Sequence, residues 1–153
     1  MGVLTSVTNR EEEVKLNVGC GFDRKEGYVH IDSDYRIGPD IVRDIERGMP
    51  YGDNTVDEIF TSHTLEHINP DQIHYVMFEF WRILKNGAQL QVIVPIGKGL
   101  TNSPEHKCFF DYRSTLFFTD WNLREPYKFK LVREGVIGQD ITEELHFVLE
   151  AVK

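Results

Sequence analysis

The sequence lacks three features that would place it in a specialised class of protein. It has only two cysteines, Cys20 and Cys108, too few for a disulfide framework or a four-ligand zinc site. Its longest apolar run, about Val92 to Ile96, is far shorter than the roughly 18 residues of a membrane span. Met1 to Arg10 contains no apolar signal-peptide core. We therefore expect a cytoplasmic protein with two free thiols and no membrane contact.

An excess of basic side chains is also missing. The 153 residues include 17 Lys and Arg against 25 Asp and Glu, a formal charge of −8. Domains that bind nucleic acid by neutralising phosphates usually carry a clustered basic excess, so no nucleic-acid partner is expected. The length suits one domain with its own core. We assign residues 1–13, which are polar and lack an apolar period, to an N-terminal arm, and residues 14–153 to this domain.

Short apolar runs bounded by turn formers indicate the strands. The first two predicted strands are separated by too few residues to hold the helix that normally connects two parallel strands. The apolar run Val92–Val94 predicts burial on both faces, as in a parallel sheet. The last two runs predict an antiparallel pair. The expected strands cover residues 14–18, 28–32, 41–42, 56–61, 89–96, 127–136 and 145–152.

One amphipathic helix is predicted with clear ends. Asn69 is placed as its N-cap and Pro70 at its first position, while Asn86-Gly87 supplies a left-handed stop. A further short helix is expected within residues 109–121. Together these elements predict α/β architecture with a mostly parallel sheet. The apolar stripe that defines the long helix consists of Ile73, Val76, Met77, Phe80, Trp81 and Leu84.

Small and acidic residues follow the carboxyl ends of the first four strands. Ligands of open α/β sheets bind beyond these ends. Glycines let a ligand lie against the backbone, and an acid after the second strand can accept hydrogen bonds from two ribose hydroxyls. The pattern predicts a nucleoside site formed by Asn17, Gly19, Cys20, Gly21, Asp32, Asp44, Ser62 and His63.

Five segments, in order, resemble motifs of the class I S-adenosylmethionine-dependent methyltransferases, in particular a small minimal branch whose first motif is Leu-Asn-Val-Gly-Cys-Gly. The resemblance implies a Rossmann-like fold, S-adenosylmethionine as cofactor, and methyl transfer to a small molecule or glycan precursor. It also implies that Asp32 holds the ribose, Asp44 meets the adenine amino group and Ile45 packs on the ring. The five segments are Leu16–Gly21, Gly27–Asp32, Arg43–Ile45 with its continuation to Asp57, Ser62–His67 and Arg82–Ala88.

Two departures from the family pattern bear on the cofactor. Phe22 stands where a third glycine is usual, and the helix after the glycine segment is nearly deleted. A dinucleotide would miss that helix, because its N-terminus holds the pyrophosphate. S-adenosylmethionine has no phosphate and carries a sulfonium cation, which also suits the 13 acidic and 7 basic side chains of residues 1–60. The shortened crossover therefore favours a methyl donor.

The sequence indicates less clearly which residues would assist the methyl transfer itself. An acceptor that must lose a proton needs a base, and His106 and His67 are the candidates; a plain surface role for His106 remains open. Residues 98–133 hold seven basic and four acidic side chains among many aromatics, which suits an anionic or sugar-like acceptor or simple core packing. A second copy of the chain, in a homo-oligomer, could close an otherwise open pocket.

Three other functions stay open. A catalytically silent module would bind the cofactor without an acceptor pocket, and a nicotinamide oxidoreductase would bind a dinucleotide. A zinc hydrolase is suggested by His63-Thr64-Leu65-Glu66-His67, an inverted zinc-protease pattern to which Glu143 or Glu144 could add a ligand. That pattern needs a long helix, and Asn69-Pro70 starts a new one, so no metal is expected.

Overall fold

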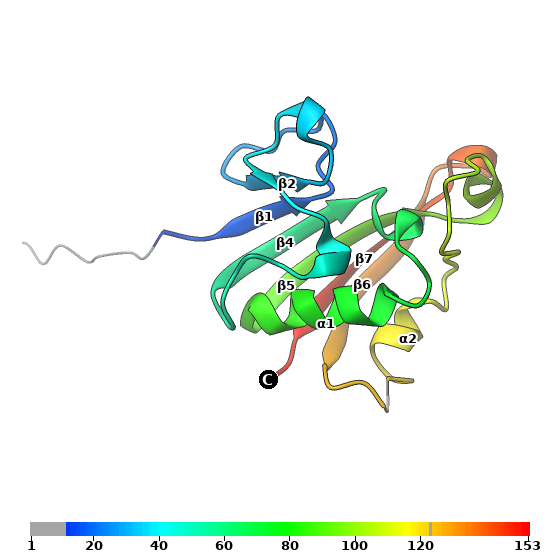
Figure 1. Cartoon of the computed structure of the whole chain (residues 1–153). Helices are drawn as coiled ribbons and strands as arrows, with labels where there is room; N and C mark the ends of the chain where they lie inside the picture. The colour runs from blue at the N-terminus through cyan, green and yellow to red at the C-terminus, as the bar shows by residue number, and fades with distance from the viewer. Residues whose placement is uncertain (1–11, 123) are drawn as a thin grey trace, which may run out of the picture.

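The centre of the molecule is a seven-stranded sheet with the order β3-β2-β1-β4-β5-β7-β6 (Figure 1). The computed structural model describes residues 12–122 and 124–153, so the arm expected over residues 1–13 lies almost wholly outside them. Strands β1 to β5 pair in parallel, and β7 pairs antiparallel with both β5 and β6. The predicted Rossmann-like, mostly parallel sheet with a C-terminal antiparallel pair is confirmed.

The strands lie within a few residues of their predicted positions, and the ends differ most around β5. The strands are β1 (Lys15–Val18), β2 (Val29–Asp32), β3 (Ile41–Val42), β4 (Val56–Ser62), β5 (Leu84–Pro95), β6 (Phe129–Ile137) and β7 (Glu144–Ala151). The helices are α1 (Ile73–Ile83) and α2 (Thr115–Phe118), with 3₁₀ turns η1 (Tyr35–Ile37), η2 (Ile45–Arg47), η3 (Leu65–His67), η4 (Gly97–Thr101) and η5 (Asp140–Thr142).

The first crossover is as short as predicted. No helix lies between β1 and β2; instead the backbone N–H groups of Gly19 and Cys20 donate to the carbonyl oxygen of Ile31 at 2.8 and 3.1 Å. The chain turns at the glycines and returns directly to the neighbouring strand. The glycine segment therefore ends in an open turn rather than at a helix N-terminus.

Helix α1 has the predicted apolar face, but both of its predicted ends are wrong. The helix begins at Ile73, not at Pro70, and Gln72 precedes it without a side-chain cap. The Asn69 side chain does not cap the helix, because its Oδ1 accepts from Lys107 Nζ at 3.1 Å and its Nδ2 donates to Glu46 Oε2 at 2.6 Å. At the other end the chain passes straight into β5 at Leu84, before the predicted stop at Asn86-Gly87.

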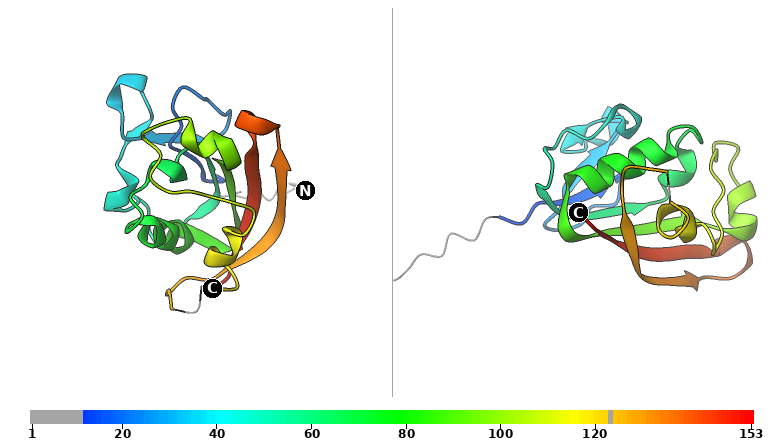
Figure 2. Two further views of the ribbon diagram at one scale, coloured as in Figure 1. Left: turned by 90° about the vertical axis from the view of Figure 1, so that its right-hand side faces the viewer. Right: turned by 90° about the horizontal axis from the view of Figure 1, so that it is seen from below.

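Both described α-helices lie on one face of the sheet (Figure 2). The opposite face carries no helix in the described parts of the chain. Val92 and Val94 are buried, whereas Ile93 between them is only half-buried. The expectation that this run is buried on both faces was therefore wrong, because side chains alternate across a strand and only one face is covered. No helix among the described residues is long and apolar enough to cross a membrane.

Candidate active site

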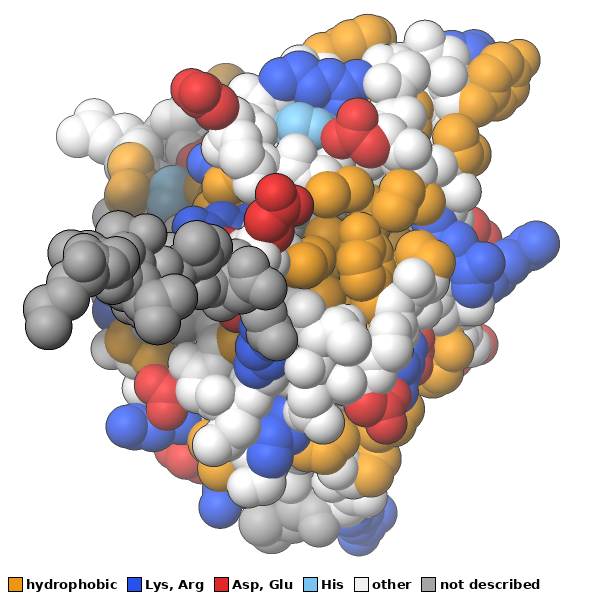
Figure 3. All heavy atoms as spheres, turned by 90° about the vertical axis from the view of Figure 1, so that its left-hand side faces the viewer, with side chains coloured by type: hydrophobic (Ala, Val, Ile, Leu, Met, Phe, Trp, Pro, Cys, Tyr) orange, Lys and Arg blue, Asp and Glu red, His pale blue; other side chains and the backbone are white. Residues whose placement is uncertain are grey.

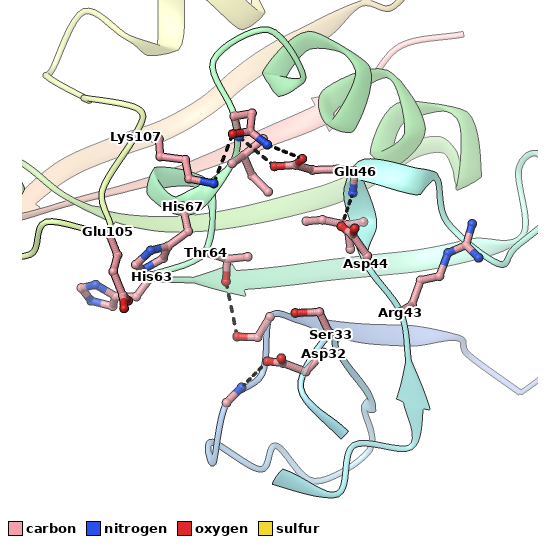
Figure 4. A pocket seen from close by; sticks show the side chains of 15 residues that line it. Asp32, Ser33, Arg43, Asp44, Glu46, His63, Thr64, His67, Glu105 and Lys107 are labelled. Atoms are coloured by element: carbon pink, nitrogen blue, oxygen red, sulfur yellow. Dashed lines mark hydrogen bonds between the residues drawn. The ribbon is translucent and has the colours of Figure 1, made fainter. Parts of the chain in front are cut away.

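A cavity of about 570 Å³ opens at the carboxyl ends of β1 to β4 (Figure 4). Its size lies in the range of small-molecule sites. The cavity is where the strand order predicts a ligand, since the chain leaves β1 toward β2 on one side and reaches β4 on the other. Of the predicted site residues, those on its wall are Gly19, Gly21, Asp32, Asp44, Ile45, His63 and His67.

The two glycines shape the floor of the cavity for different reasons. Gly19 and Gly21 have φ values of 66° and 50°, a region that L side chains rarely adopt. A Cβ on Gly19 would lie 2.1 Å from Thr64 Oγ1, so this glycine lets the end of β4 pack against the turn. A Cβ on Gly21 would meet nothing within 4 Å, so the space above its backbone is open to a ligand.

Asp32 is held in a fixed orientation by the backbone. Its Oδ2 accepts from Gly21 N at 2.9 Å, and its Oδ1 accepts from Asp34 N at 3.0 Å. Each carboxylate oxygen can accept a second hydrogen bond. The carboxylate therefore keeps two acceptor positions, as the predicted contact with a ribose diol requires.

A chain of hydrogen bonds ties the η2 side of the cavity to the loop after β5. Asp44 accepts from Glu46 N at 3.1 Å, and Ile45 beside it is 7% exposed. Glu46 in turn accepts from the backbone and side-chain nitrogens of Asn69 at 2.8 and 2.6 Å. Lys107 Nζ donates to Asn69 Oδ1 at 3.1 Å. Three separate segments are thereby fixed around one opening.

His63 sits at the end of β4 in a left-handed conformation, with a φ of 51°. Its Nε2 lies 2.7 Å from Glu144 Oε1, and its Nδ1 lies 3.4 Å from Glu66 Oε1. The carboxylates, first Glu66 and then Glu144, raise the pKa of His63 to about 9. The cavity wall therefore carries an imidazolium at neutral pH.

Four of the predicted residues do not line the cavity. Asn17 is buried on β1, where its Nδ2 donates to Asp23 O at 3.0 Å. Cys20 is 4% exposed and packs under the turn, and burial raises the pKa of its thiol. Ser62, half-buried at the end of β4, and His106 are also absent from the wall.

Several wall residues were not predicted. Ser33 and Arg43 follow directly after predicted strands, and Thr64 lies three residues after one, so strand ends alone could have indicated them. Glu105 and Lys107 come from the loop after β5. This loop is brought back by a long-range contact, and nothing in its own sequence indicates that return.

The two candidate bases lie next to each other. His67 is on the cavity wall, whereas His106 is half-buried behind it, with ring centroids 5.0 Å apart at an interplanar angle of 72°. His67 belongs to η3, a turn of three residues, and His63 lies before it at the end of β4. The long helix that would place both histidines on one face, as the inverted zinc-protease pattern requires, is therefore absent here.

Charges on the cavity wall are mixed, with acids in excess. Figure 3 shows the face of the molecule that lies on the left in Figure 1. Acidic and basic side chains are interspersed there around a central group of hydrophobic side chains. No continuous basic field is visible on this face, in agreement with the composition. The charged wall residues, apart from histidine, are Asp32, Asp44, Glu46 and Glu105 against Arg43 and Lys107.

Residues 20–92 match a family described as a methyltransferase domain. No curated protein sequence matches the chain. Among solved structures, a SAM-dependent methyltransferase from Methanosarcina mazei has 16% identity and a TM-score of 0.68, covering 93% of this chain and 94% of that one. One from Aquifex aeolicus has 19% identity and a TM-score of 0.66, covering 93% and 84%.

The N-methyltransferase NodS of Bradyrhizobium japonicum, solved with S-adenosylhomocysteine, has 14% identity and a TM-score of 0.69, covering 92% of this chain and 79% of that one. At these identities the likeness establishes the fold. The matched domain runs from the glycine turn through η2 and α1 into β5, the segment that builds most of the cavity. Fold and domain match together support a methyltransferase.

Proposed function

We propose that the protein transfers the methyl group of S-adenosylmethionine to a small molecule or glycan precursor. The observation that carries the proposal is the arrangement around Asp32. A backbone-oriented carboxylate faces the open space above Gly21, at the end of the strand where a nucleoside is expected. The solved relatives described as SAM-dependent methyltransferases support the same cofactor.

The residues present fit this cofactor. The Asp32 carboxylate suits the ribose hydroxyls, and the buried Ile45 offers an apolar surface for the adenine ring, with Asp44 beside it as an acceptor for the amino group. The excess of acids on the wall favours a sulfonium cation. The imidazolium of His63, on the same wall, suits the carboxylate of the methionine moiety.

When bound, S-adenosylmethionine supplies a methyl group already activated by its sulfonium. The chain then has to orient the acceptor and exclude competing water. Three hydrogen bonds among Glu46, Asn69 and Lys107 fix the far side of the cavity. His67 is the base that this wall offers to an acceptor that must lose a proton.

Calorimetry with purified protein tests the cofactor directly. S-adenosylmethionine and S-adenosylhomocysteine are titrated in parallel with a nicotinamide dinucleotide. We expect micromolar binding of the two adenosyl compounds and none of the dinucleotide, because no helix N-terminus follows the glycine turn to hold a pyrophosphate. Binding of the dinucleotide alone would contradict the proposal.

Turnover is tested separately with a panel of small-molecule and sugar-like acceptors. Formation of S-adenosylhomocysteine is followed with each acceptor and without any. Acceptor-dependent formation supports the transferase. Binding without turnover on every acceptor, sugar-like ones included, would instead indicate a module that holds the cofactor but catalyses nothing.

A further inference from the structure

Three potential metal ligands meet behind the acceptor end of the cavity. One ligand atom each of Glu66, His67 and His106 lies within 4.8 Å of the others. Glu66 and His67 belong to η3, whereas His106 comes from the loop after β5. Lys107 N and Cys108 N donate to the backbone oxygen of Glu66 at 2.7 and 3.0 Å and hold the loop against η3.

The Glu66 carboxylate is the buried member of this cluster. Its side chain is fully buried, and neither oxygen has a hydrogen-bond partner. His63 Nδ1 lies 3.4 Å from Oε1 as an ion-pair partner, and His67 Nε2 lies 4.0 Å from the same oxygen, both beyond good hydrogen-bond distance. A buried carboxylate that accepts no hydrogen bond is costly. The carboxylate therefore keeps unused acceptor positions that a metal ion could occupy.

His106 is already oriented as a ligand. Its Nδ1 lies 2.9 Å from Leu100 O. A carbonyl oxygen only accepts, so Nδ1 carries the proton and Nε2 of the neutral ring keeps its lone pair. Histidines that bind metals are typically held in this way, with the second nitrogen donating to a carbonyl or carboxylate.

We propose that Glu66, His67 and His106 bind one divalent transition-metal ion. Two imidazoles and one carboxylate suit zinc(II) and its neighbours, and leave further coordination positions open. Since His67 lines the cavity (Figure 4), the ion would lie at the cavity wall. In the metal-bound protein His67 is a ligand and no longer the base for an acceptor. Metal–ligand distances of about 2.1 Å require the donor atoms, which now lie within 4.8 Å of one another, to move closer together.

This site differs from the inverted zinc-protease pattern weighed from the sequence. There His63 and His67 would be ligands and Glu66 a base for water. Here His63 is engaged by Glu144, Glu66 is itself a ligand, and the third ligand comes from a distant loop. Metal binding is also independent of the cofactor, so its test needs neither S-adenosylmethionine nor a methyl acceptor.

The test is calorimetric titration of zinc(II) into tag-free full-length protein treated with a chelator, with cobalt(II) absorption as a spectroscopic readout. We expect one equivalent to bind, and visible cobalt bands typical of nitrogen and oxygen ligands. Glu66→Gln and His106→Gln should each weaken zinc binding at least about tenfold. His30→Gln is the matched control, since this histidine lies on β2, outside the cluster, and pairs with Asp40.

Melting temperatures distinguish metal binding from a purely structural role of Glu66. If Glu66 is a metal ligand, zinc should raise the melting temperature of the unsubstituted chain but not that of the Glu66→Gln protein. If its role is only structural, zinc should shift both melting temperatures equally. No zinc binding by the unsubstituted protein would overturn the proposal. Equal zinc affinity in the His106→Gln and His30→Gln proteins would overturn it as well.

Discussion

At the scale of single residues, Gly19 both lines the cavity and allows the end of β4 to pack closely against the turn after β1. Its backbone is left-handed, and the space a side chain would need is filled by Thr64 from the end of β4. Gly19→Ala should lower the free energy of unfolding by about 2 to 4 kcal/mol, combining the cost of the backbone conformation with that of overpacking. Urea denaturation measures the change.

The matched control is Gly27→Ala. Gly27 also has a positive φ, of 81°, but nothing lies within 4 Å of its added Cβ. This substitution should cost only about 1 kcal/mol. In addition, Thr64→Gly should partly restore the stability of the Gly19→Ala protein, because it removes the clashing side chain. Equal losses at Gly19 and Gly27, without such coupling, would show that the contact with Thr64 does not matter.

Asp32 carries the largest expected effect on affinity. Asp32→Ala should weaken binding of S-adenosylmethionine by roughly 1 to 3 kcal/mol, because the ribose hydroxyls would lose their partner in a partly buried site. This corresponds to about a 5- to 150-fold rise in Kd, measurable by calorimetry. Asp34→Asn, two residues away and outside the cavity wall, serves as control. An unchanged Kd for Asp32→Ala would remove Asp32 from the site.

At the scale of elements, an ion pair within α1 holds the helix against the segment before β4, because both of its members also bond to that segment. Glu79 is 6% exposed and accepts from Met49 N at 2.7 Å and from Arg82 Nε at 2.6 Å. The Arg82 guanidinium, more than the Met49 amide, holds the pKa of Glu79 below its ordinary value of 4.5. The pair therefore stabilises the fold above pH 4.5, and this contribution is lost as the pH falls through the lowered pKa.

Glu79→Gln should accordingly lower the free energy of unfolding by about 2 kcal/mol at pH 7. The deficit should shrink as the pH falls below 4.5, since the unsubstituted protein then loses the same interaction. Urea denaturation across this pH range provides the measurement. Glu13→Gln, which breaks the exposed pair with Lys15, should change little at any pH. A deficit that stays constant with pH would contradict the assignment.

The same helix shows what the sequence can and cannot predict. The apolar stripe identified α1 because periodicity is a local property, and the strands followed from equally local runs. The start of α1 was predicted wrongly because the Asn69 side chain bonds instead to Glu46 and Lys107, residues 23 and 38 positions away. Such competition between a local cap and a distant partner has no local signature.

For the whole molecule, one side of the cavity follows from local sequence patterns, whereas the other depends on long-range contacts. Gly19, Asp32, Asp44 and His63 could be predicted because parallel strands bring their carboxyl ends to one edge. The side formed by Glu105 and Lys107 exists only because the loop after β5 bonds back to Glu66. The prediction that the strand at Val92–Val94 is buried on both faces failed for a related reason. An apolar run does not reveal whether helices cover one face of a sheet or both.

The completed cavity should couple ligand binding to global stability. At a concentration one hundred times its Kd, S-adenosylmethionine should stabilise the fold by about 2.7 kcal/mol. For a chain of this length that corresponds to a rise in Tm of about 5 to 10 °C in a thermal denaturation experiment. A nicotinamide dinucleotide at equal concentration should cause no rise, because the turn between β1 and β2 offers no helix N-terminus to its pyrophosphate. Equal rises with both compounds would mean that the cavity recognises only their shared adenosine, and the preference for a methyl donor drawn from the short crossover would be wrong.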